Sequence, residues 1–370
     1  MPISVPSESS EPSAPFVRTS PSAQVPPPRP VIPDAPGDDD AYTTALIDFV
    51  TASPTSYHAV AETASRLDAV GLSQADESRP WGAGTPRRGY VVRDGAIVAW
   101  ILPERCDERA GFRIVGAHTD SPALKLKPSA AMVRDGVQVL DVEVYGGPLL
   151  NSFLDRELGL AGRLVTRDGA VRLVRTGPVA RVAQVAPHLD RSVNDSLHLD
   201  RQANLLPLWT LATDGARPDD PERHLCELAG IDPRELAFHD ILTFPTERPA
   251  RFGRHDEFLA SSRLDNLSSV HAALVALEAL AREGSEPDEP VVMIANDHEE
   301  VGSATRSGRA ALSSRRSWGA CRGCSASPAT PGRPCSPARS ACPRMPGTPS
   351  TPDTPTCTTR RSGPPSTGGR

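Results

Sequence analysis

The chain is organised around the stretch Val291-Val-Met-Ile-Ala-Asn-Asp-His-Glu-Glu-Val-Gly-Ser303. Residues 291–295 are an apolar run of strand length, and a run of four ionisable residues, from Asp297 to Glu300, follows almost at once. When polar residues directly follow a buried strand, their side chains lie at the edge of the sheet where the strand ends. The stretch therefore predicts a buried strand with a chemical site at its end.

Two adjacent carboxylates in this stretch, Glu299 and Glu300, repel each other unless a positive charge lies nearby, and a divalent metal commonly supplies that charge. Adjacent residues point in different directions, so the two glutamates are expected to have different roles. One can bind the metal while the other accepts a proton from water. The alternative interpretation is a solvated acidic loop, and the rest of the chain has to decide.

Length and composition limit the class of protein. The 370 residues are enough for one large domain or two, and the net charge of -6 gives no indication of a nucleic-acid partner. The sequence has neither an apolar run long enough to span a membrane nor the segments of a signal peptide. We therefore expect a cytoplasmic protein without a membrane partner.

Proline and cysteine gather at the two ends of the chain. Residues 1–38 and 311–370 together hold 22 of the 39 prolines, which predicts a disordered extension and a disordered tail. Five of the seven cysteines fall in the last 60 residues. Only Cys106 and Cys226 lie in the part expected to fold, too few for a disulfide framework.

The first folded segments are expected to be two helices and a hairpin. A helical pattern covers 45–50, and a second amphipathic helix covers 58–70 and ends at Gly71. Two strand-like runs, 89–92 and 96–102, are joined through an Asp-Gly pair, which is typical of a β-hairpin.

The next predicted strand, 112–118, ends in a second polar group. His118 and Asp120 are two positions apart and so lie on the same side of an extended chain. In such a pair the histidine can bind a metal while the carboxylate fixes its tautomer. A capped turn is the alternative interpretation of this short pattern.

A second carboxylate candidate lies before a helix. Apolar residues at positions 267, 270, 274, 277 and 281 predict one buried helix face, which places Asp265 at or just before the helix N-terminus. Asp265 is either an N-cap or a carboxylate placed to bridge two cations. Between the two polar groups, residues 129–235 alternate short Val/Leu-rich segments with turns and predict a mostly β insert.

Five motifs, taken in their order and spacing, resemble the M18 family of metalloaminopeptidases. They are Val115-Gly-Ala-His-Thr-Asp-Ser-Pro122, Tyr145-Gly-Gly147, Phe153-Leu-Asp-Arg156, Ser262-Arg-Leu-Asp-Asn266 and His298-Glu-Glu-Val-Gly-Ser303. Each motif is weak alone, and without the resemblance Tyr145-Gly-Gly147 is only a turn that packs. The resemblance covers residues 41 to about 305.

The resemblance implies an α/β fold with a zinc-aminopeptidase-type catalytic domain in two parts, 39–128 and 236–310. A β-rich dimerisation insert, 129–235, interrupts it. The resemblance also implies two zinc ions per subunit, a peptide substrate and a homo-oligomer, which is a dodecamer in the family.

The same resemblance implies roles for the metal-site residues. His118 matches the first metal ligand, and Asp120 matches the carboxylate that orients it. Asp265 matches the ligand that bridges both metals. Glu300 matches a terminal ligand of the second metal.

Two further residues are implied to act on the substrate. Glu299 matches the general base, which takes a proton from water and passes it to the leaving amine, so that one N-terminal residue is removed. His188 aligns with a substrate-contacting histidine that reaches a neighbouring subunit. From its own flanks alone, His188 is a surface or core histidine.

The resemblance stops after about Ala311, where the family continues with an aspartate ligand, an Ala-His-Ala-x-His-Pro segment and a final histidine ligand. We interpret residues 311–370 as a frameshifted tail, because Arg344 to Pro352 shifted by two nucleotides can read Asp-Ala-Arg-His-Ala-Val-His-Pro. Sequencing the gene tests this. Without those ligands each zinc keeps two protein ligands, so both are expected to bind weakly.

Two alternatives remain open at this point. The chain is either an impaired aminopeptidase or a non-catalytic remnant that only oligomerises through the β-rich insert. The pattern Cys321-Arg-Gly-Cys324 is half of a possible zinc site, but its Ser/Pro-rich surroundings and the wider spacing of Cys335 and Cys342 disfavour one.

Overall fold

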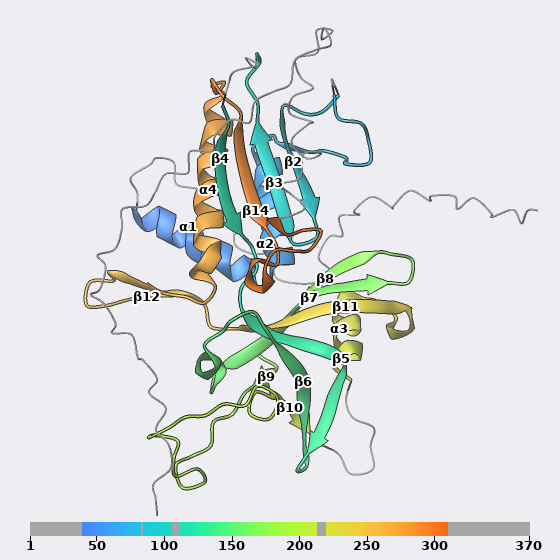
Figure 1. Ribbon diagram of the computed structural model, residues 1–370, viewed down its shortest axis with the longest axis vertical. Helices are drawn as coiled ribbons and strands as arrows, with labels where there is room; N and C mark the ends of the chain where they lie inside the picture. Colours follow the sequence, from blue (N-terminus) through green and yellow to red (C-terminus); the bar gives the residue numbers. More distant parts are fainter. Residues whose placement is uncertain (1–38, 83, 106–110, 213–219, 310–370) are drawn as a thin grey trace, which may run out of the picture. The chain divides into compact units, whose positions relative to one another are not determined.

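The computed structural model describes residues 39–82, 84–105, 111–212 and 220–309 (Figure 1). The ends predicted to be disordered, including the tail interpreted as frameshifted and its cysteine pattern, lie outside the described residues. Among the residues described, no helix combines the length and the apolar character needed to cross a lipid bilayer.

The first sheet has five strands in the order β1-β2-β3-β14-β4. Its strands are β1 (Ser73–Gln74), β2 (Arg88–Arg93), β3 (Ala96–Ile101), β14 (Val291–Asn296) and β4 (Arg113–His118). β2 and β3 form the predicted hairpin, and β14 pairs antiparallel with β3 but parallel with β4. The strand expected at 291–295 is therefore inside this sheet, between two neighbours.

Three helices cover one face of the first sheet: α1 (Asp39–Ala52), α2 (Ser56–Ala69) and α4 (Leu264–Glu283). Helix α4 confirms the periodic pattern, because all five apolar positions predicted for it, from Leu267 to Ala281, are buried. Helix α2 ends at Ala69, and the predicted stop residue Gly71 follows its C-cap Val70 with a φ of 84°.

The inner strands β3 and β14 of the first sheet are apolar on both faces, and both faces are covered there, whereas Ile114 and Val115 of the edge strand β4 are exposed. In β3, Ile97, Ala99 and Ile101 face the core formed with the helices. The alternate residues, such as Trp100, join a smaller apolar cluster on the opposite face. β14 divides in the same way, with Met293 facing the helices and Val292 facing the smaller cluster. Such two-sided burial explains the continuous apolar run.

The second sheet has seven strands in the order β11-β5-β6-β10-β9-β7-β8, with an additional pairing of β11 with β7. They are β5 (Ala123–Arg134), β6 (Val137–Tyr145), β7 (Glu157–Thr166), β8 (Val171–Arg175), β9 (Ala180–Arg181), β10 (Leu208–Leu211) and β11 (Leu236–Pro245). Because β11 pairs with both β5 and β7, the pairings form a closed circuit, to which β8 is added on β7. Closure leaves few unpaired strand edges.

The strands of this second sheet extend beyond the predicted insert of 129–235. β5 already starts at Ala123, and β11 ends at Pro245 after pairing with β7 from Leu236↔Thr166 to Pro245↔Leu158. The sheet is therefore longer than the segment whose composition predicted the insert, because strand pairing decides which segments belong to one sheet. The division into catalytic and dimerisation domains stays a prediction.

The second sheet has its own core, to which helix α3 (Pro221–Ala229) contributes Leu225 and Cys226. Asp220 caps this helix by accepting a hydrogen bond from the amide of Glu222, and Gly230 ends it in the left-handed conformation. Cys226 is a free thiol in this core and is buried. Cys106 lies outside the described residues.

The remaining described elements are short. Strands β12 (Ala250–Phe252) and β13 (Phe258–Ala260) form a two-stranded hairpin. Three turns of 3₁₀ helix are η1 (Leu150–Phe153), η2 (Pro233–Glu235) and η3 (Glu299–Val301). The last of these, η3, follows β14 after Asp297 and His298 and carries Glu299 and Glu300.

A buried histidine lies between helices α1 and α4. His271 has no exposed surface, and its ring packs against the rings of Tyr42 and Phe49 at centroid distances of 5.0 and 5.5 Å. Neither ring nitrogen has a hydrogen-bond partner within the described part of the chain. Burial, together with the charge of Arg66, lowers the pKa of His271 from 6.5 to about 3. The side chain is therefore neutral in the folded protein.

Replacing His271 by phenylalanine is expected to make the protein less sensitive to acid. Between pH 6.5 and about 3 the unfolded chain binds a proton at this position that the folded chain does not bind. Stability is therefore lost as the pH falls through this window, by about 1.4 kcal/mol per pH unit for one histidine. Urea unfolding between pH 7 and 4 measures this slope. His255→Phe, at an exposed position, is the control, and an unchanged slope in His271→Phe would contradict the prediction.

Candidate metal centre

Three segments that are distant in sequence supply the residues of the candidate site. β4 and β14 are parallel, and Asn296 pairs with His118, so both strands end at the same edge of the first sheet. η3 follows there with Glu299 and Glu300, and the start of α4 brings Asp265 to the same place. The three predicted groups of polar residues therefore meet.

Each ring nitrogen of His118 lies close to oxygen atoms of an aspartate, Nδ1 to those of Asp120 and Nε2 to that of Asp265. Its Nδ1 lies 3.1 Å from the carbonyl oxygen of Asp120 and 3.5 Å from a carboxylate oxygen of the same residue. Its Nε2 lies 3.1 Å from Oδ1 of Asp265. When Nδ1–H donates to Asp120, Nε2 and the Asp265 oxygen are both acceptors, so a positive charge is needed between them.

The pKa of His118 reflects that requirement. Burial lowers it, but the hydrogen bonds and charge of Asp120, with the charge of Asp265, outweigh burial and raise it to about 9. Without a metal, a proton on the ring supplies the positive charge. A metal ion at Nε2 would replace this proton, because only the deprotonated nitrogen binds metal.

Asp120 is the centre of the hydrogen bonds that hold the site. Its side chain is almost fully buried, and its two oxygens accept hydrogen bonds from the amides of Glu299, at 3.1 Å, and Glu300, at 3.2 Å. The hydroxyl of Tyr145 donates to the same carboxylate at 2.7 Å. Burial raises the pKa of Asp120, but His118, Tyr145 and the two amides outweigh it and lower the pKa. Asp120 is thus ionised.

Within the described residues, one group of three side chains could hold a metal: His118, Glu299 and Glu300. One ligand atom from each lies within 4.8 Å of the others. Burial and the neighbouring carboxylates of Asp120, Asp265 and Glu299 raise the pKa of Glu300, and the charge of His118 partly offsets this. Because Glu299 belongs to this group of three, the residue predicted as the general base is also within reach of a metal.

Asp265 is not a helix cap. Asp265 and Asn266 interrupt the helical backbone near the start of α4, and no hydrogen bond found among the described residues joins the Asp265 carboxylate to an amide of the helix. Its side chain is 85% exposed and turns toward His118 instead of toward the amides of the helix. The bridging role implied for it stays a prediction.

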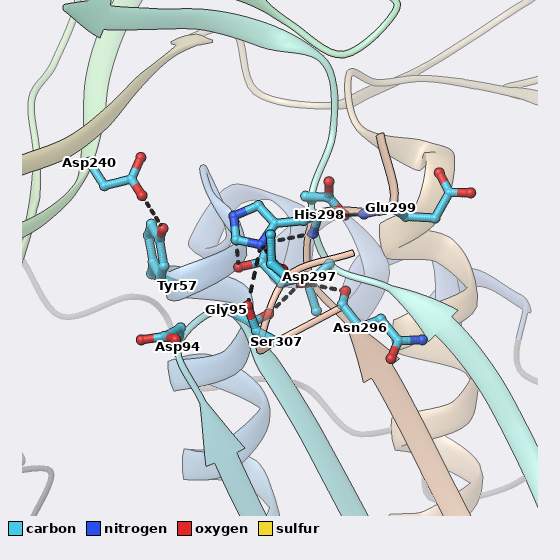
Figure 2. A network of polar contacts seen from close by, with 12 residues as sticks. Tyr57, Asp94, Gly95, Asp240, Asn296, Asp297, His298, Glu299 and Ser307 are labelled. Atoms are coloured by element: carbon cyan, nitrogen blue, oxygen red, sulfur yellow. Dashed lines mark hydrogen bonds and ion pairs between the residues drawn. The ribbon is translucent and has the colours of Figure 1, made fainter. Parts of the chain in front are cut away.

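A polar network anchors the end of β14 behind the site (Figure 2). Asp297 is buried, its amide donates to the carbonyl of Ser307, and its carboxylate accepts from the amide of His298. The imidazole of His298 lies 2.8 Å from the hydroxyl of Thr305 and 3.3 Å from that of Ser307. These contacts fix the loop that leads into η3.

Gly95, in the turn that joins β2 and β3, leaves the space in which the Asp297 carboxylate lies. A β-carbon at Gly95 would collide with the carboxylate of Asp297 and the hydroxyl of Ser56. Burial raises the pKa of Asp297 from 3.8 to about 6, although the charge of His298 opposes this. The Asp-Gly turn, predicted only as a hairpin signal, therefore also makes space behind the site.

Contacts from the second sheet reach the first near this network. The hydroxyl of Tyr57 in α2 donates to Asp240 of β11 at 2.5 Å (Figure 2). Arg163 of β7 lies 4.6 Å above the Tyr57 ring and donates to Asp94 at 2.6 Å. None of these residues was predicted as functional, because their partners lie far away in sequence.

His188 is not brought into the site within this chain. It is exposed in the turn after β9, and no hydrogen bond or ion pair found among the described residues joins it to His118, Glu299 or Glu300. The implied role for His188 involves a neighbouring subunit and stays a prediction. Tyr145, in contrast, was treated as part of a turn, but the structure places its hydroxyl on Asp120.

The donor set fits zinc. It combines one imidazole nitrogen with carboxylate oxygens, which zinc accepts as ligands. The two acceptors that face each other at 3.1 Å, on His118 and Asp265, require a cation or a proton between them. Asp120 holds the other ring nitrogen, through its backbone carbonyl at 3.1 Å and its carboxylate at 3.5 Å, and backbone carbonyls and carboxylates are the usual partners behind a metal-binding histidine.

The comparison with protein families gives a match over residues 49–314 to the family described as aminopeptidase I zinc metalloprotease (M18). The "probable M18 family aminopeptidase 2" of Streptomyces coelicolor is 47% identical over 272 residues. The match covers 73% of this chain and 62% of the relative, so the chain spans less than two thirds of that protein's length.

Solved structures agree in fold. The crystal structure of yeast aminopeptidase 1 matches with a TM-score of 0.67 at 26% identity, covering 76% of this chain and 68% of the other. The S. cerevisiae mApe1 dodecamer matches with a TM-score of 0.64 at 25% identity, covering 77% and 67%. With the family match, the relative and these structures in agreement, this chain belongs to the M18 family of aminopeptidase I zinc metalloproteases.

Proposed function

We propose that this chain is a zinc-dependent aminopeptidase of the cytoplasm that removes N-terminal residues, acidic ones among them, from peptides. The observation that carries the proposal is the meeting of His118, Glu299 and Glu300 at the ends of two parallel strands, with one ligand atom from each within 4.8 Å of the others. Family membership supports the same activity.

The contacts support a role for each residue of the site. His118, Asp265 and Glu300 would hold zinc, and Asp120 keeps the ring of His118 oriented through its Nδ1. Glu299, exposed at the start of η3, accepts a proton from water and later gives it to the leaving amine. When bound, zinc supplies Lewis-acid polarisation of the peptide carbonyl and makes water more acidic.

Two zinc ions are proposed, with Asp265 bridging them, and both are proposed to bind weakly. A catalytic zinc usually has three protein ligands. Here one ion would have His118 with Asp265, and the other would have Asp265 with Glu300. The additional aspartate and histidine implied by the resemblance have no counterparts that can be read in residues 311–370.

We also propose that the chain forms a homo-oligomer through the β-rich second sheet, and that His188 contacts the substrate of a neighbouring subunit. The support is that a protein similar to this chain is described as a dodecamer. The exposed position of His188 is compatible with a contact outside its own subunit.

Replacing Glu299 by glutamine is expected to lower the hydrolysis rate of aminoacyl substrates by about 10²–10⁴-fold, because glutamine cannot accept a proton. The zinc content of the purified variant is expected to stay near that of the unaltered chain if Glu299 is the base. Chromogenic aminoacyl substrates, acidic and neutral, together with zinc analysis of the same samples, measure both quantities.

Glu283→Gln, at the exposed end of α4, is the matched control and should leave both quantities unchanged. A large loss of zinc in Glu299→Gln would instead make Glu299 a ligand, as its position within reach of His118 and Glu300 allows. Absence of both zinc and hydrolysis in the unaltered chain would favour the non-catalytic remnant that only oligomerises.

A further inference from the structure

The turn after β6 approaches the site from the second sheet. Tyr145 is the last residue of β6, and its backbone is paired with Ala123 of β5. Its side chain leaves the sheet and donates a hydrogen bond of 2.7 Å to Asp120. The ring also lies edge-on to His298, at a centroid distance of 6.4 Å. The second sheet thus reaches the centre of the candidate site.

Tyr145 donates its hydrogen bond to Asp120, whose carboxylate also accepts from the backbone amides of Glu299 and Glu300. Asp120 accepts from Tyr145 on the same oxygen that accepts from the amide of Glu300, and its other oxygen accepts from the amide of Glu299. Burial, with the nearby charge of Asp120, raises the pKa of Tyr145, so the hydroxyl keeps its proton and stays a donor. Loss of this donor would leave Asp120 free to shift and carry both amides with it.

Gly146 makes an independent contact with the same site. Its φ of 73° is in the left-handed region, which favours glycine. A β-carbon built on Gly146 would lie 3.0 Å from Cβ and 3.1 Å from Oε2 of Glu300. The neighbouring Gly147 has no atom within 4 Å of such a β-carbon. Gly146 therefore leaves the space in which the Glu300 side chain lies.

We propose that Tyr145 and Gly146 are positioning residues, through which the second sheet sets the place of Glu299 and Glu300. Tyr145 acts on the two backbone amides through Asp120, and Gly146 acts on the Glu300 side chain by close approach. The inference rests on the proposed function in that the positioned carboxylates serve a zinc site.

The test compares two tyrosines, Tyr145 of β6 and Tyr57 of α2, whose hydroxyls each donate a hydrogen bond to an aspartate. Tyr145→Phe removes the donor to Asp120, and Tyr57→Phe removes the donor to Asp240, which lies outside the metal site. Zinc affinity of each full-length variant is measured by competition with a chromogenic chelator, and zinc-free stability by thermal unfolding. We expect Tyr145→Phe to bind zinc about 10- to 100-fold more weakly, as is typical when a partner behind a metal ligand is lost.

Tyr57→Phe is expected to lower the melting temperature of the zinc-free protein and to keep the zinc affinity of the unaltered chain. Equal zinc affinity in Tyr145→Phe and the unaltered chain would overturn the positioning role, and so would an equal loss of affinity in both variants. Absence of zinc binding in the unaltered chain would overturn the proposed function instead.

Two further measurements keep the inference testable if zinc binding or folding fails. A crystal structure of zinc-free Tyr145→Phe should show Asp120 and the backbone of Glu299 and Glu300 displaced, and an unchanged position would overturn the inference. If Tyr145→Phe does not fold, Gly146→Ala should weaken zinc binding, whereas Gly147→Ala should leave it unchanged. Equal affinity in these two glycine variants would also overturn the inference.

Discussion

Replacing Asp120 by alanine is expected to weaken zinc binding by about 100-fold, the upper end of the range seen for partners behind a metal ligand. The substitution removes the carboxylate that orients His118 and that accepts from Tyr145 and the amides of Glu299 and Glu300. It should also lower the free energy of unfolding by at least about 2 kcal/mol, because each buried donor left without an acceptor costs about 1–3 kcal/mol.

Asp120→Asn separates these two effects. Asparagine keeps the size of the side chain and one acceptor oxygen, so it should lose less stability than alanine while still weakening zinc binding. Asp141→Ala is the control carboxylate, since Asp141 forms a partly exposed ion pair with Lys127 that is expected to contribute about 0–1 kcal/mol. Chelator competition and urea unfolding measure the two quantities. Wild-type zinc affinity in Asp120→Ala would contradict the prediction.

Replacing Glu278 by alanine is expected to lower the free energy of unfolding by about 3–5 kcal/mol, because it leaves a buried charge without its partner. Arg66 of α2 donates two hydrogen bonds, of 2.7 and 2.8 Å, to Glu278 of α4, and both side chains are nearly inaccessible to water. The pair joins two of the three helices that cover the first sheet. Urea unfolding of the zinc-free protein measures the loss.

Two comparisons make the Glu278 prediction specific. Glu77→Ala breaks an ion pair of similar geometry with Arg93, but at a partly exposed position, and is expected to cost less than about 1 kcal/mol. The double variant Arg66→Met with Glu278→Leu removes both charges and should recover most of the stability lost in the single variant. A single variant as stable as Glu77→Ala would refute the expectation.

Much of the fold could be predicted from local pattern. The five apolar positions of α4 are all buried, the Asp-Gly pair joins two antiparallel strands, and the run at 291–295 is a strand apolar on both faces. These features depend on periodicity and turn chemistry, which act over a few residues. The bounds of the second sheet could not be predicted in this way, because β11 joins it by pairing with residues of β7 that lie 70 to 87 positions away in the chain.

The residues of the candidate site were predicted, and so was the support of His118 by Asp120, but the supports from Tyr145 and Gly146 were not. His118, Asp265 and Glu300 were singled out because their residue types match metal ligands, and the parallel pairing of β4 with β14 brings two of their segments together. Tyr145 and Gly146 belong to one of the five motifs but were given no role at the site, since a tyrosine and a glycine in a turn are common. Their importance depends on Asp120 and Glu300, which become neighbours only in the folded chain.

The sequence by itself therefore determined the elements, the apolar faces and the family, because hydrophobic periodicity and motif spacing are properties of the linear chain. Only the tertiary structure decided which sheet each strand joins, that Asp265 faces His118 rather than capping its helix, and that the second sheet supports the site through Tyr145. The physical reason is that hydrogen bonds and close packing between distant segments depend on how strands pair, and local sequence does not specify that pairing.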